Sequence, residues 1–341
     1  MRIAVDAAGG DHGLDIVLPG ALDGARRFGV DLLLTGPEAE IRGALAKLGA
    51  ADINIIVEDA PDIISMDDPP AQAVRRKPRS AIAVALDAVR AGRADGMVSA
   101  GNSGAVMAGA LFKLGRIRGV ERPAIAGYLP AMNGKTLVLD MGAVTDPRPI
   151  HLVQFAQMGS VYTERALGVA HPTVGLLSNG EEPSKGNQLV QETFPLLATA
   201  PGISFYGNVE GNDITRGVVD VVVTDGFTGN VALKTAEGAA ALINATLRRR
   251  LTSSLFRKAL TGLLYPAFNE VKKELDYAEQ GGAPLLGIDG VVVISHGRSN
   301  ARAVASAIGV AKQSVEGDVP GRIARLMTRL EPAPQPVEVT G

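Results

Sequence analysis

Short apolar runs alternate with helix-period segments along most of the chain. Runs typical of strands occur at Ile3–Val5, Val30–Thr35 and Ile53–Val57, and a segment with spaced apolar positions such as Glu38–Leu48 is typical of the intervening helices. Strands that alternate with helices favour a parallel sheet. We therefore predict an α/β fold with a mostly parallel sheet and helices on both faces.

The pattern gives no clear place to divide the chain into two domains. There is no internal repeat, and no linker is poor enough in apolar residues to mark a boundary. We predict one large α/β unit over residues 1–330, with a helical excursion at about 248–278. The tail over residues 331–341 is rich in proline and is predicted to be disordered.

Four predicted strands are each followed by small polar residues and then a helix. The fullest example is Asp220–Gly238, in which the strand Val221–Val223 leads through a glycine-containing turn into an alanine-rich helix. Similar turns follow the strands that end at Val5, Val98 and Ile294. In a parallel sheet such turns place backbone N–H groups at the carboxyl edge, where anions bind. We predict that the four turns converge on one phosphate-sized anion.

Residue type and position give three sets of candidate site residues. The residues predicted to bind the anion are Gly101, Asn102, Ser103, Gly104, Gly226, Thr228, Gly229, Lys234, Arg298 and Ser299. The residues predicted to take part in catalysis are Asp225, His296 and Asn230. The residues predicted to shape the cleft are Gly9, Gly10, Asp11, Arg79, Asp140, Glu182, Lys185, Asn208 and Glu210.

Some of these positions have two readings. Asp140 ends a strand and either orients a reacting group or caps the next helix. The segment Asp59–Pro78 is acidic, then proline-rich, then basic, and is either a solvated loop or a flap that brings cations to the substrate. His151 begins a helix and is interpreted as a surface or capping residue rather than a base.

Composition removes several classes of function. The 341-residue chain has no cysteine, which excludes disulfides and a cysteine nucleophile. Its formal net charge of −2 argues against a nucleic-acid partner. There is no metal-ligand spacing, dinucleotide fingerprint or Walker A sequence, so no metal or cofactor is predicted. The apolar runs are too short for a signal region or a membrane span, so a cytoplasmic protein is expected.

Much of the scarce aromatic content lies in one amphipathic stretch, Leu251–Phe268, next to the basic run Arg248–Arg250. Apolar residues beside cations suit an anionic bilayer surface, but they also suit a dimer contact or ordinary helix packing. The residues predicted for membrane or dimer contact are Leu255, Phe256, Leu260, Leu263 and Leu264.

Eight segments, in this order, resemble a known family. They are VDAAGGDHG, SAGNSGA, LDMGAVTDPRP, NGEEPSKGN, GNVEGNDI, DVVVTDGFTGNVALKTAEG, GAPLLGIDG and ISHGRSNA. The chain is similar over residues 1 to about 325 to the bacterial phosphate acyltransferases of phospholipid synthesis, PlsX. Three positions depart from the family pattern, namely Ala8, Val144 and Asn179. Val144 stands where the family usually has a polar asparagine, which argues against a direct role for that position here.

The resemblance implies transfer of a fatty acyl group from acyl-[acyl-carrier protein] to inorganic phosphate. The acyl phosphate product would feed a membrane glycerol-3-phosphate acyltransferase. It also implies a fold of the isocitrate/isopropylmalate dehydrogenase type, a homodimer, and peripheral membrane contact. Arg75–Arg79 or Arg248–Arg250 would then dock the acidic carrier.

Three other functions compete with this one. A coenzyme A-dependent phosphotransacetylase is the nearest. An NAD-dependent decarboxylating dehydrogenase on the same fold would need Mg²⁺-binding carboxylates, and no clear spacing for them is present. The third is a non-catalytic scaffold that binds a membrane or a partner.

Overall fold

The structure is a computed structural model that describes residues 1–132, 134–254, 261–262, 264 and 281–330. One sheet crosses the whole molecule, in the order β3-β2-β1-β4-β11-β10-β5-β6-β9-β7-β8. Its strands are β1 Arg2–Asp6, β2 Asp31–Gly36, β3 Ile55–Asp59, β4 Gly96–Ser99, β5 Ala124–Ala131, β6 Gly134–Leu139, β7 Thr173–Leu177, β8 Ser204–Val209, β9 Val221–Val223, β10 Ala283–Leu286 and β11 Val291–Ile294.

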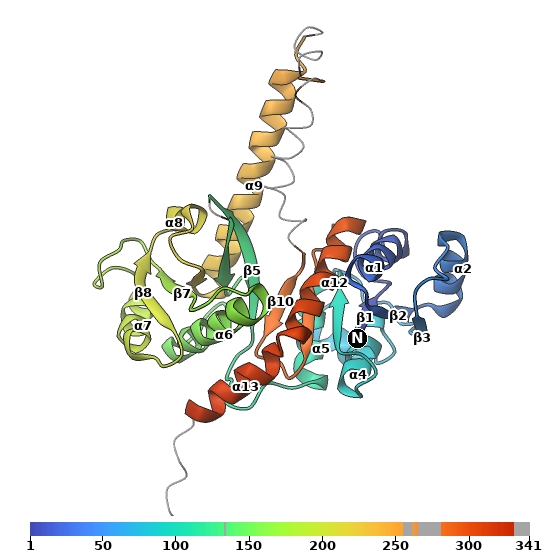
Figure 1. Cartoon of the computed structure of the whole chain (residues 1–341), viewed down its shortest axis with the longest axis horizontal. Helices are drawn as coiled ribbons and strands as arrows, with labels where there is room; N and C mark the ends of the chain where they lie inside the picture. The colour runs from blue at the N-terminus through green and yellow to red at the C-terminus, as the bar shows by residue number, and fades with distance from the viewer. Residues whose placement is uncertain (133, 255–260, 263, 265–280, 331–341) are drawn as a thin grey trace, which may run out of the picture.

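Helices cover both faces of this sheet, as the sequence predicted (Figure 1). In the order of the chain they are α1 Leu14–Phe28, α2 Glu38–Leu48, α3 Pro70–Arg76, α4 Ala81–Arg90, α5 Ser103–Lys113, α6 Pro149–Leu167, α7 Gln188–Thr199, α8 Gly211–Arg216, α9 Gly226–Leu251, α12 Ala301–Glu316 and α13 Val319–Leu330. Alternate residues of one strand separate the two layers, since Ile3 packs with α1 and α12 while Ala4 packs with α4 and α5.

The sheet consists of two parallel groups that run in opposite directions. β3, β2, β1, β4 and β11 are parallel to one another, and so are β6, β9, β7 and β8. Between the groups, the pairings β11–β10, β10–β5 and β5–β6 are all antiparallel. Three successive reversals leave the second group antiparallel to the first. The carboxyl ends of the two groups therefore lie on opposite sides of the sheet, at opposite ends of the strands. We call the side where β1, β4 and β11 end the first edge, and the side where β6 and β9 end the second edge.

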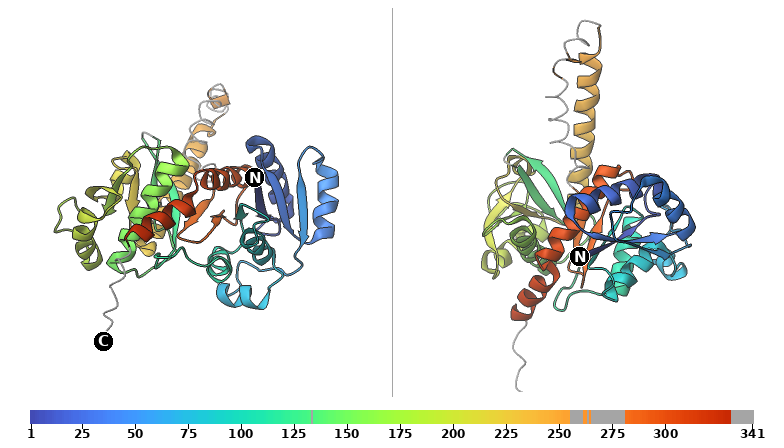
Figure 2. Two further views of the ribbon diagram at one scale, coloured as in Figure 1. Left: turned by 60° about the horizontal axis from the view of Figure 1, so that its bottom comes forward. Right: turned by 45° about the vertical axis from the view of Figure 1, so that its right-hand side comes forward.

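Helix α9 runs between these two edges. It begins directly after β9, and its later turns rise out of the body between the two halves (Figure 1). The rotated views show the same helix standing clear of both halves, with the strands of each half on either side (Figure 2). It starts at Gly226, earlier than the helix expected from Ala232, because Asp225 caps it by accepting from the Thr228 N–H at 2.8 Å.

The structure differs from the prediction in one segment and in two strands. The flap Asp59–Pro78 contains the helix α3, which starts with a proline in its first turn and buries Ala73 and Val74. The strands β5 and β10 were not expected, although they supply the reversals in the sheet. The predicted excursion at 248–278 and the tail at 331–341 fall largely or wholly outside the described residues.

Candidate active site

Three of the four predicted turns meet at one edge of the sheet, after β1, β4 and β11. The approach is close because glycine has no side chain: a Cβ at Gly9 would lie 2.6 Å from Asp6 Oδ2 and 2.7 Å from the Gly101 nitrogen. A Cβ at Gly10 would lie 3.0 Å from the Gly297 carbonyl oxygen. The Asp11 N–H donates to that same carbonyl at 2.8 Å. Glycines here let three chain segments touch.

A buried acid holds two of these turns together. The Ser99 hydroxyl donates to Asp6 Oδ2 at 2.6 Å and accepts from the Gly101 N–H at 3.1 Å. Burial raises the pKa of Asp6 to about 6, although Ser99 and the N–H groups of Ala8 and Gly9 act in the opposite direction. Asp6 was not among the predicted site residues, and its role is to fix the turns rather than to face the cavity.

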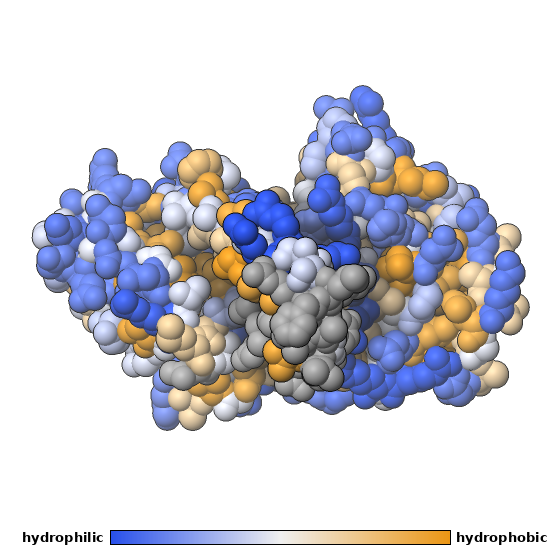
Figure 3. All heavy atoms as spheres, turned by 90° about the horizontal axis from the view of Figure 1, so that it is seen from above, coloured by the Kyte–Doolittle hydropathy of each residue, from blue (hydrophilic) through white to orange (hydrophobic). Residues whose placement is uncertain are grey.

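Above these turns lies a cavity of about 760 Å³. It contains six of the predicted site residues, and these are Asp11, Ser103, Lys234, His296, Arg298 and Ser299. Residues that the prediction missed also line it, and these are Met66, Glu237, Gly281, Gly282, Ile294, Ser295, Gly297 and Ala303. From above, the edge that carries α9 shows strongly hydrophilic residues between the two halves (Figure 3).

Lys234 reaches this cavity from the other half of the sheet along α9. Its Nζ lies 2.9 Å from Glu237 Oε2 and 3.4 Å from His296 Nε2. The Arg298 N–H donates to His296 Nδ1 at 3.1 Å, so the proton of a neutral imidazole sits on Nε2. Nε2–H and the lysine ammonium are therefore two donors only 3.4 Å apart, and an anion beside the pair would accept from both.

The Asn102 side chain is engaged at both of its polar atoms by the protein itself. Its Oδ1 accepts from the Ala105 N–H at 3.0 Å and so caps α5. Its Nδ2 lies 3.1–3.2 Å from the carbonyl oxygens of Ser65, Met66 and Asp68. The amide thus fixes the segment that carries Met66 to the cavity wall. Its side chain is committed to the protein, and direct contact with the anion stays a prediction.

Ser295 is the one wall residue with a buried hydroxyl that lacks a partner among the described residues. It is 2% exposed, and its Oγ makes no hydrogen bond. A Cβ at Gly282 would stand 2.9 Å from this Oγ, so the small residue there leaves room for the hydroxyl. An unpaired buried hydroxyl costs free energy unless something else satisfies it.

The fourth turn, after β9, opens at the opposite edge. Asp225 and Thr228 line a separate cavity of about 360 Å³, together with Ser178 and Asn187. The carboxylate of Asp225 is used in capping α9. The structure therefore does not bring Asp225 and Thr228 to the cavity that holds Lys234, and only α9 connects the two places.

Asp140 is a buried acid at the second edge that binds the backbone of the turn after β6. Its carboxylate accepts N–H groups from Ile125, Gly142, Ala143 and Val144, at 2.9, 3.1, 3.0 and 2.6 Å. It is fully buried, and burial raises its pKa to about 6 despite these four bonds. Asp140 does not cap the next helix, because α6 begins at Pro149 with Arg148 as its N-cap, and its carboxylate holds the preceding turn instead. A role of Asp140 in orienting a reacting group stays a prediction.

The predicted residues Gly226, Gly229 and Asn230 pack on the turn that follows Asp140. A Cβ at Gly226 would lie 2.7 Å from Asp140 Oδ2, and a Cβ at Gly229 would overlap the Asp140 carbonyl oxygen. Asn230 Nδ2 donates to the Met141 carbonyl at 3.4 Å. These glycines are explained by close packing, and anion binding by them stays a prediction.

Other predicted residues are not part of the large cavity's wall. Arg79 pairs with Asp59 at 2.9 Å on the surface. The Glu182 carbonyl accepts from Asn208 Nδ2 at 2.9 Å and from the Lys185 N–H at 3.0 Å, so these three residues brace one loop. Glu210 precedes α8, and its N–H donates to Asp213 at 2.9 Å. A Cβ at Gly104 would meet the Pro70 ring at 2.6 Å, which explains that glycine by packing against α3.

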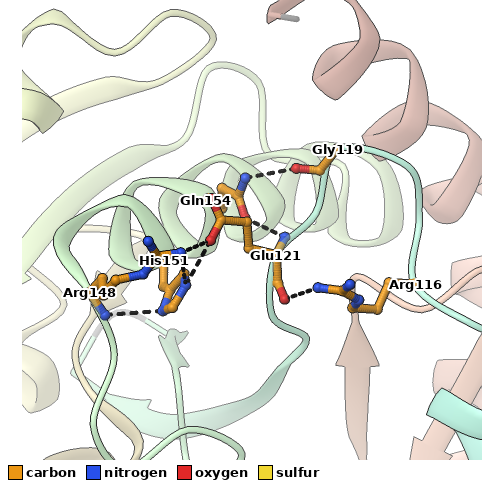
Figure 4. Close-up of polar contacts among 6 residues, drawn as sticks. All are labelled: Arg116, Gly119, Glu121, Arg148, His151 and Gln154. Atoms are coloured by element: carbon orange, nitrogen blue, oxygen red, sulfur yellow. Dashed lines mark hydrogen bonds and ion pairs between the residues drawn. The ribbon is translucent and has the colours of Figure 1, made fainter.

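A basic cluster lies at the second edge, around the start of α6 (Figure 4). His151 is only 5% exposed, and its Nδ1 accepts the Arg148 N–H at 3.0 Å. Its Nε2 lies 3.1 Å from Glu121 Oε2, which also pairs with Arg148. The interpretation of His151 as a capping residue is confirmed, and its placement on the surface is wrong.

Most of the segment predicted for membrane or dimer contact lies outside the described residues. Leu255, Phe256, Leu260 and Leu263 lie outside the described residues, whereas Leu264 is 57% exposed. On α9, Leu242 and Ile243 are 69% and 56% exposed. Within the described part of the chain, no helix has both the length and the apolar character needed to cross a membrane. The same residues contain no group of three or more acidic or histidine side chains placed to hold a metal.

Comparison with known sequences gives one consistent result. A family model described as "Fatty acid synthesis protein" matches residues 1–322. A phosphate acyltransferase from Anaeromyxobacter sp. (strain Fw109-5) is 51% identical, with 96% of this chain and 91% of the relative covered. A phosphate acyltransferase from Geobacter sulfurreducens is 48% identical, with 96% and 94% covered.

Solved structures with little sequence identity share the fold. A phosphotransacetylase from Streptococcus pyogenes has a TM-score of 0.61 at 17% identity and covers 92% of this chain and 94% of its own. A structure from Salmonella typhimurium named for a 4-hydroxythreonine-4-phosphate dehydrogenase has a TM-score of 0.54 at 14% identity, with 92% and 98% covered. At these identities the likeness is evidence of fold alone.

Proposed function

Because the chain belongs to the phosphate acyltransferase family, we propose that it transfers a fatty acyl group from acyl-[acyl-carrier protein] to inorganic phosphate at the large cavity. The observation that carries the location is the gathering of Lys234, His296 and Arg298 in one wall. Among the described residues, by contrast, no lysine or arginine lines the cavity beside the β9 turn.

The chemistry asks for positioning and charge stabilisation more than for an activated protein nucleophile. A phosphate oxygen attacks the thioester carbonyl carbon, the carbonyl oxygen becomes an oxyanion, and the C–S bond then breaks to release the thiol. Phosphate is already nucleophilic at neutral pH. The protein must strip water from it, hold it against the carbonyl and stabilise the oxyanion.

The contacts of the described residues support the following division of these tasks. Lys234 and Arg298 hold phosphate through charge-assisted hydrogen bonds. His296 donates from Nε2–H to an anionic oxygen, because its Nδ1 is engaged by the Arg298 N–H. The same contact leaves Nε2 without a lone pair to accept a proton, so His296 acts as a donor and not as a general base.

The test is acyl-phosphate formation by purified protein from acyl-[acyl-carrier protein] and phosphate, run beside acyl-coenzyme A. We expect the carrier-bound substrate to be preferred. Preference for coenzyme A would favour a phosphotransacetylase, and no turnover with either donor would refute the proposal. NAD-dependent oxidation should be undetectable.

Two variants separate the roles of His296. His296→Gln keeps an N–H donor near the Nε2 position, so it should retain much more activity than His296→Ala, with an unchanged acid limb in the pH profile. If both variants lose the same activity, and the acid limb with it, His296 is a base and the donor role is wrong.

The resemblance to PlsX also supports proposals about the fold type, the oligomeric state and the location of the protein. The fold is of the isocitrate/isopropylmalate dehydrogenase type, and the protein is a cytoplasmic homodimer that contacts the membrane peripherally and supplies a membrane glycerol-3-phosphate acyltransferase. The exposed apolar residues Leu242 and Ile243 on α9 support a contact with a second copy or a bilayer there. Sedimentation of the full chain with and without anionic vesicles tests both.

A further inference from the structure

We propose that the arginine pocket, defined as the cavity lined by Leu111, Arg116, Glu121, Arg122, Pro123, Arg148 and His151, is a second binding site for a phosphate-type dianion. It measures about 470 Å³ and lies around the start of α6, away from the cavity of Lys234. This inference does not depend on the proposed reaction.

The pocket has an excess of positive charge in a chain that is slightly acidic overall. Arg116, Arg122 and Arg148 contribute three guanidinium groups, and Glu121 is the single carboxylate in the lining. His151 adds no charge, since its Nδ1 accepts the Arg148 N–H and its one proton then lies on Nε2 toward Glu121. The sum is +2, which matches a dianion.

Two of the arginines are held in place before any ligand arrives (Figure 4). Arg148 pairs with the Glu121 carboxylate, and Arg116 donates to the Glu121 carbonyl. Glu121 is itself fixed, because its N–H donates to Gln154 Oε1 at 2.9 Å, and Gln154 Nε2 donates to the Gly119 carbonyl at 2.8 Å. Such preorganisation lowers the entropic cost of binding.

The donor set selects the ligand class. A guanidinium carries five N–H donors, and the contacts to Glu121 use only part of those on Arg116 and Arg148. Arginine matches the oxygens of phosphate through paired hydrogen bonds. The pocket also opens at the first turn of the 19-residue helix α6, where the helix dipole favours an anion.

The remaining wall sets the size of the ligand. Leu111 and Pro123 add an apolar side to the pocket. A volume of this order suits a small organic phosphate as well as the free ion. The same phosphate chemistry also occurs on lipid headgroups, and the experiment below includes an arm for each source.

The first arm measures equilibrium dialysis of radiolabelled inorganic phosphate against the full chain. Binding at the large cavity is first removed with the double variant Lys234→Gln/Arg298→Gln. We expect this background to retain about one bound phosphate per chain. Adding Arg122→Gln should weaken that binding by about tenfold or more, since a charge-assisted hydrogen bond is lost. Arg122 is chosen because Arg116 and Arg148 also brace Glu121.

Arg90→Gln is the matched control, because Arg90 ends α4 on the surface and is not in the pocket. It should leave phosphate binding unchanged. If the background variant binds no phosphate, or if Arg122→Gln and Arg90→Gln weaken binding equally, the arginine pocket is not a phosphate site. Failure of the acyl-transfer assay would leave this result intact, so the two proposals can fail separately.

The second arm distinguishes a free anion from a headgroup. The background variant is sedimented with phosphatidylcholine vesicles with and without phosphatidic acid. We expect no increase in bound protein that depends on Arg122, because the pocket is sized for a small ligand. Vesicle binding that Arg122→Gln abolishes, in a protein that binds no free phosphate, would overturn the small-anion proposal in favour of a membrane contact.

Discussion

The two edges of the sheet carry the same local motif and use it in opposite ways. After β1, β4 and β11, glycine turns bring chain segments together beneath a cavity whose wall contains Lys234, His296 and Arg298. After β6 and β9, the turns pack tightly against each other, and Asp140 accepts four backbone N–H groups at its centre. A strand, a glycine turn and a helix are common to both edges.

The difference lies in where the N–H groups go. At the second edge they are consumed by a buried carboxylate, so they are not available to a substrate. At the first edge many are also engaged, for example the Asp11 N–H by the Gly297 carbonyl and the Arg298 N–H by His296. Cationic and polar side chains, not a backbone nest, therefore distinguish the first edge as the proposed binding site.

The largest effect is expected when the charge of Lys234 is removed, because α9 carries this cation from the second edge to the cavity at the first edge. Lys234→Gln keeps a polar, slightly shorter side chain but deletes its charge. We expect kcat/KM for phosphate to fall by roughly 10²–10³-fold, the range seen when a stabilising donor is removed. The measurement is steady-state kinetics with varied phosphate. Lys47→Gln, at an exposed position on α2, should have no effect. Equal kinetics for the two variants would contradict the role of Lys234.

At the second edge the expected loss is in stability. Asp140→Ala leaves four N–H groups without their acceptor in a buried place. We expect the free energy of unfolding to fall by roughly 3 kcal/mol or more, because each unsatisfied buried donor is costly. Urea unfolding measures it. The folded fraction should still bind phosphate at the first edge, and selective loss of binding without loss of stability would reverse the assignment.

Both edges should respond to pH in the same direction, since burial raises the pKa of Asp6 and of Asp140 from 3.8 to about 6. Between about pH 4 and pH 6 the folded protein keeps protons that the unfolded chain releases. The contribution of each group to stability is therefore greatest below this window. It falls by up to about 3 kcal/mol as pH rises through the window and is level above it. Asp52, whose pKa is lowered to about 2, acts only below the window.

Urea unfolding between pH 4 and pH 7 tests this slope. Asp6→Asn should remove the contribution of one proton, and Asp140→Asn that of another, whatever each does to the absolute stability. A wild-type stability that rises steadily from pH 4 to pH 6, with the same slope in both variants, would show that neither carboxyl is held protonated by burial.

Much of this arrangement could be predicted from local sequence, and the limits have a physical origin. Glu38–Leu48 was predicted with its bounds, because its periodicity and flanking residues are local signals. Five of the six predicted cavity residues were found because polar residues that follow strand ends are also a local signal, and the sixth, Lys234, lies within α9. β10 was missed because it has four residues and contains Pro284, which a strand pattern disfavours.

That omission also explains the wrong grouping of the turns. With β5 and β10 absent from the prediction, the four strands that precede the glycine turns were taken as parallel to one another. Asp225 and Thr228 were therefore expected beside Lys234. The direction of the second group depends on three long-range antiparallel pairings. Such pairings leave little trace in a single segment, and neither does the partner of a buried acid such as Asp140.

The smallest effect is expected from replacing either of two buried hydroxyls, one in the cavity wall and one remote from it. Neither Ser295 Oγ nor Thr163 Oγ1 has a hydrogen-bond partner among the described residues. Ser295→Ala and Thr163→Val should therefore each raise the free energy of unfolding, by about 1 kcal/mol, since an unpaired hydroxyl is replaced by an apolar group. Thermal unfolding without phosphate measures this. Only Ser295→Ala should also weaken phosphate binding or turnover, because only Ser295 lines the cavity. If the two variants behave alike in every assay, the hydroxyl of Ser295 has no function beyond packing, and the first edge relies on its cations alone.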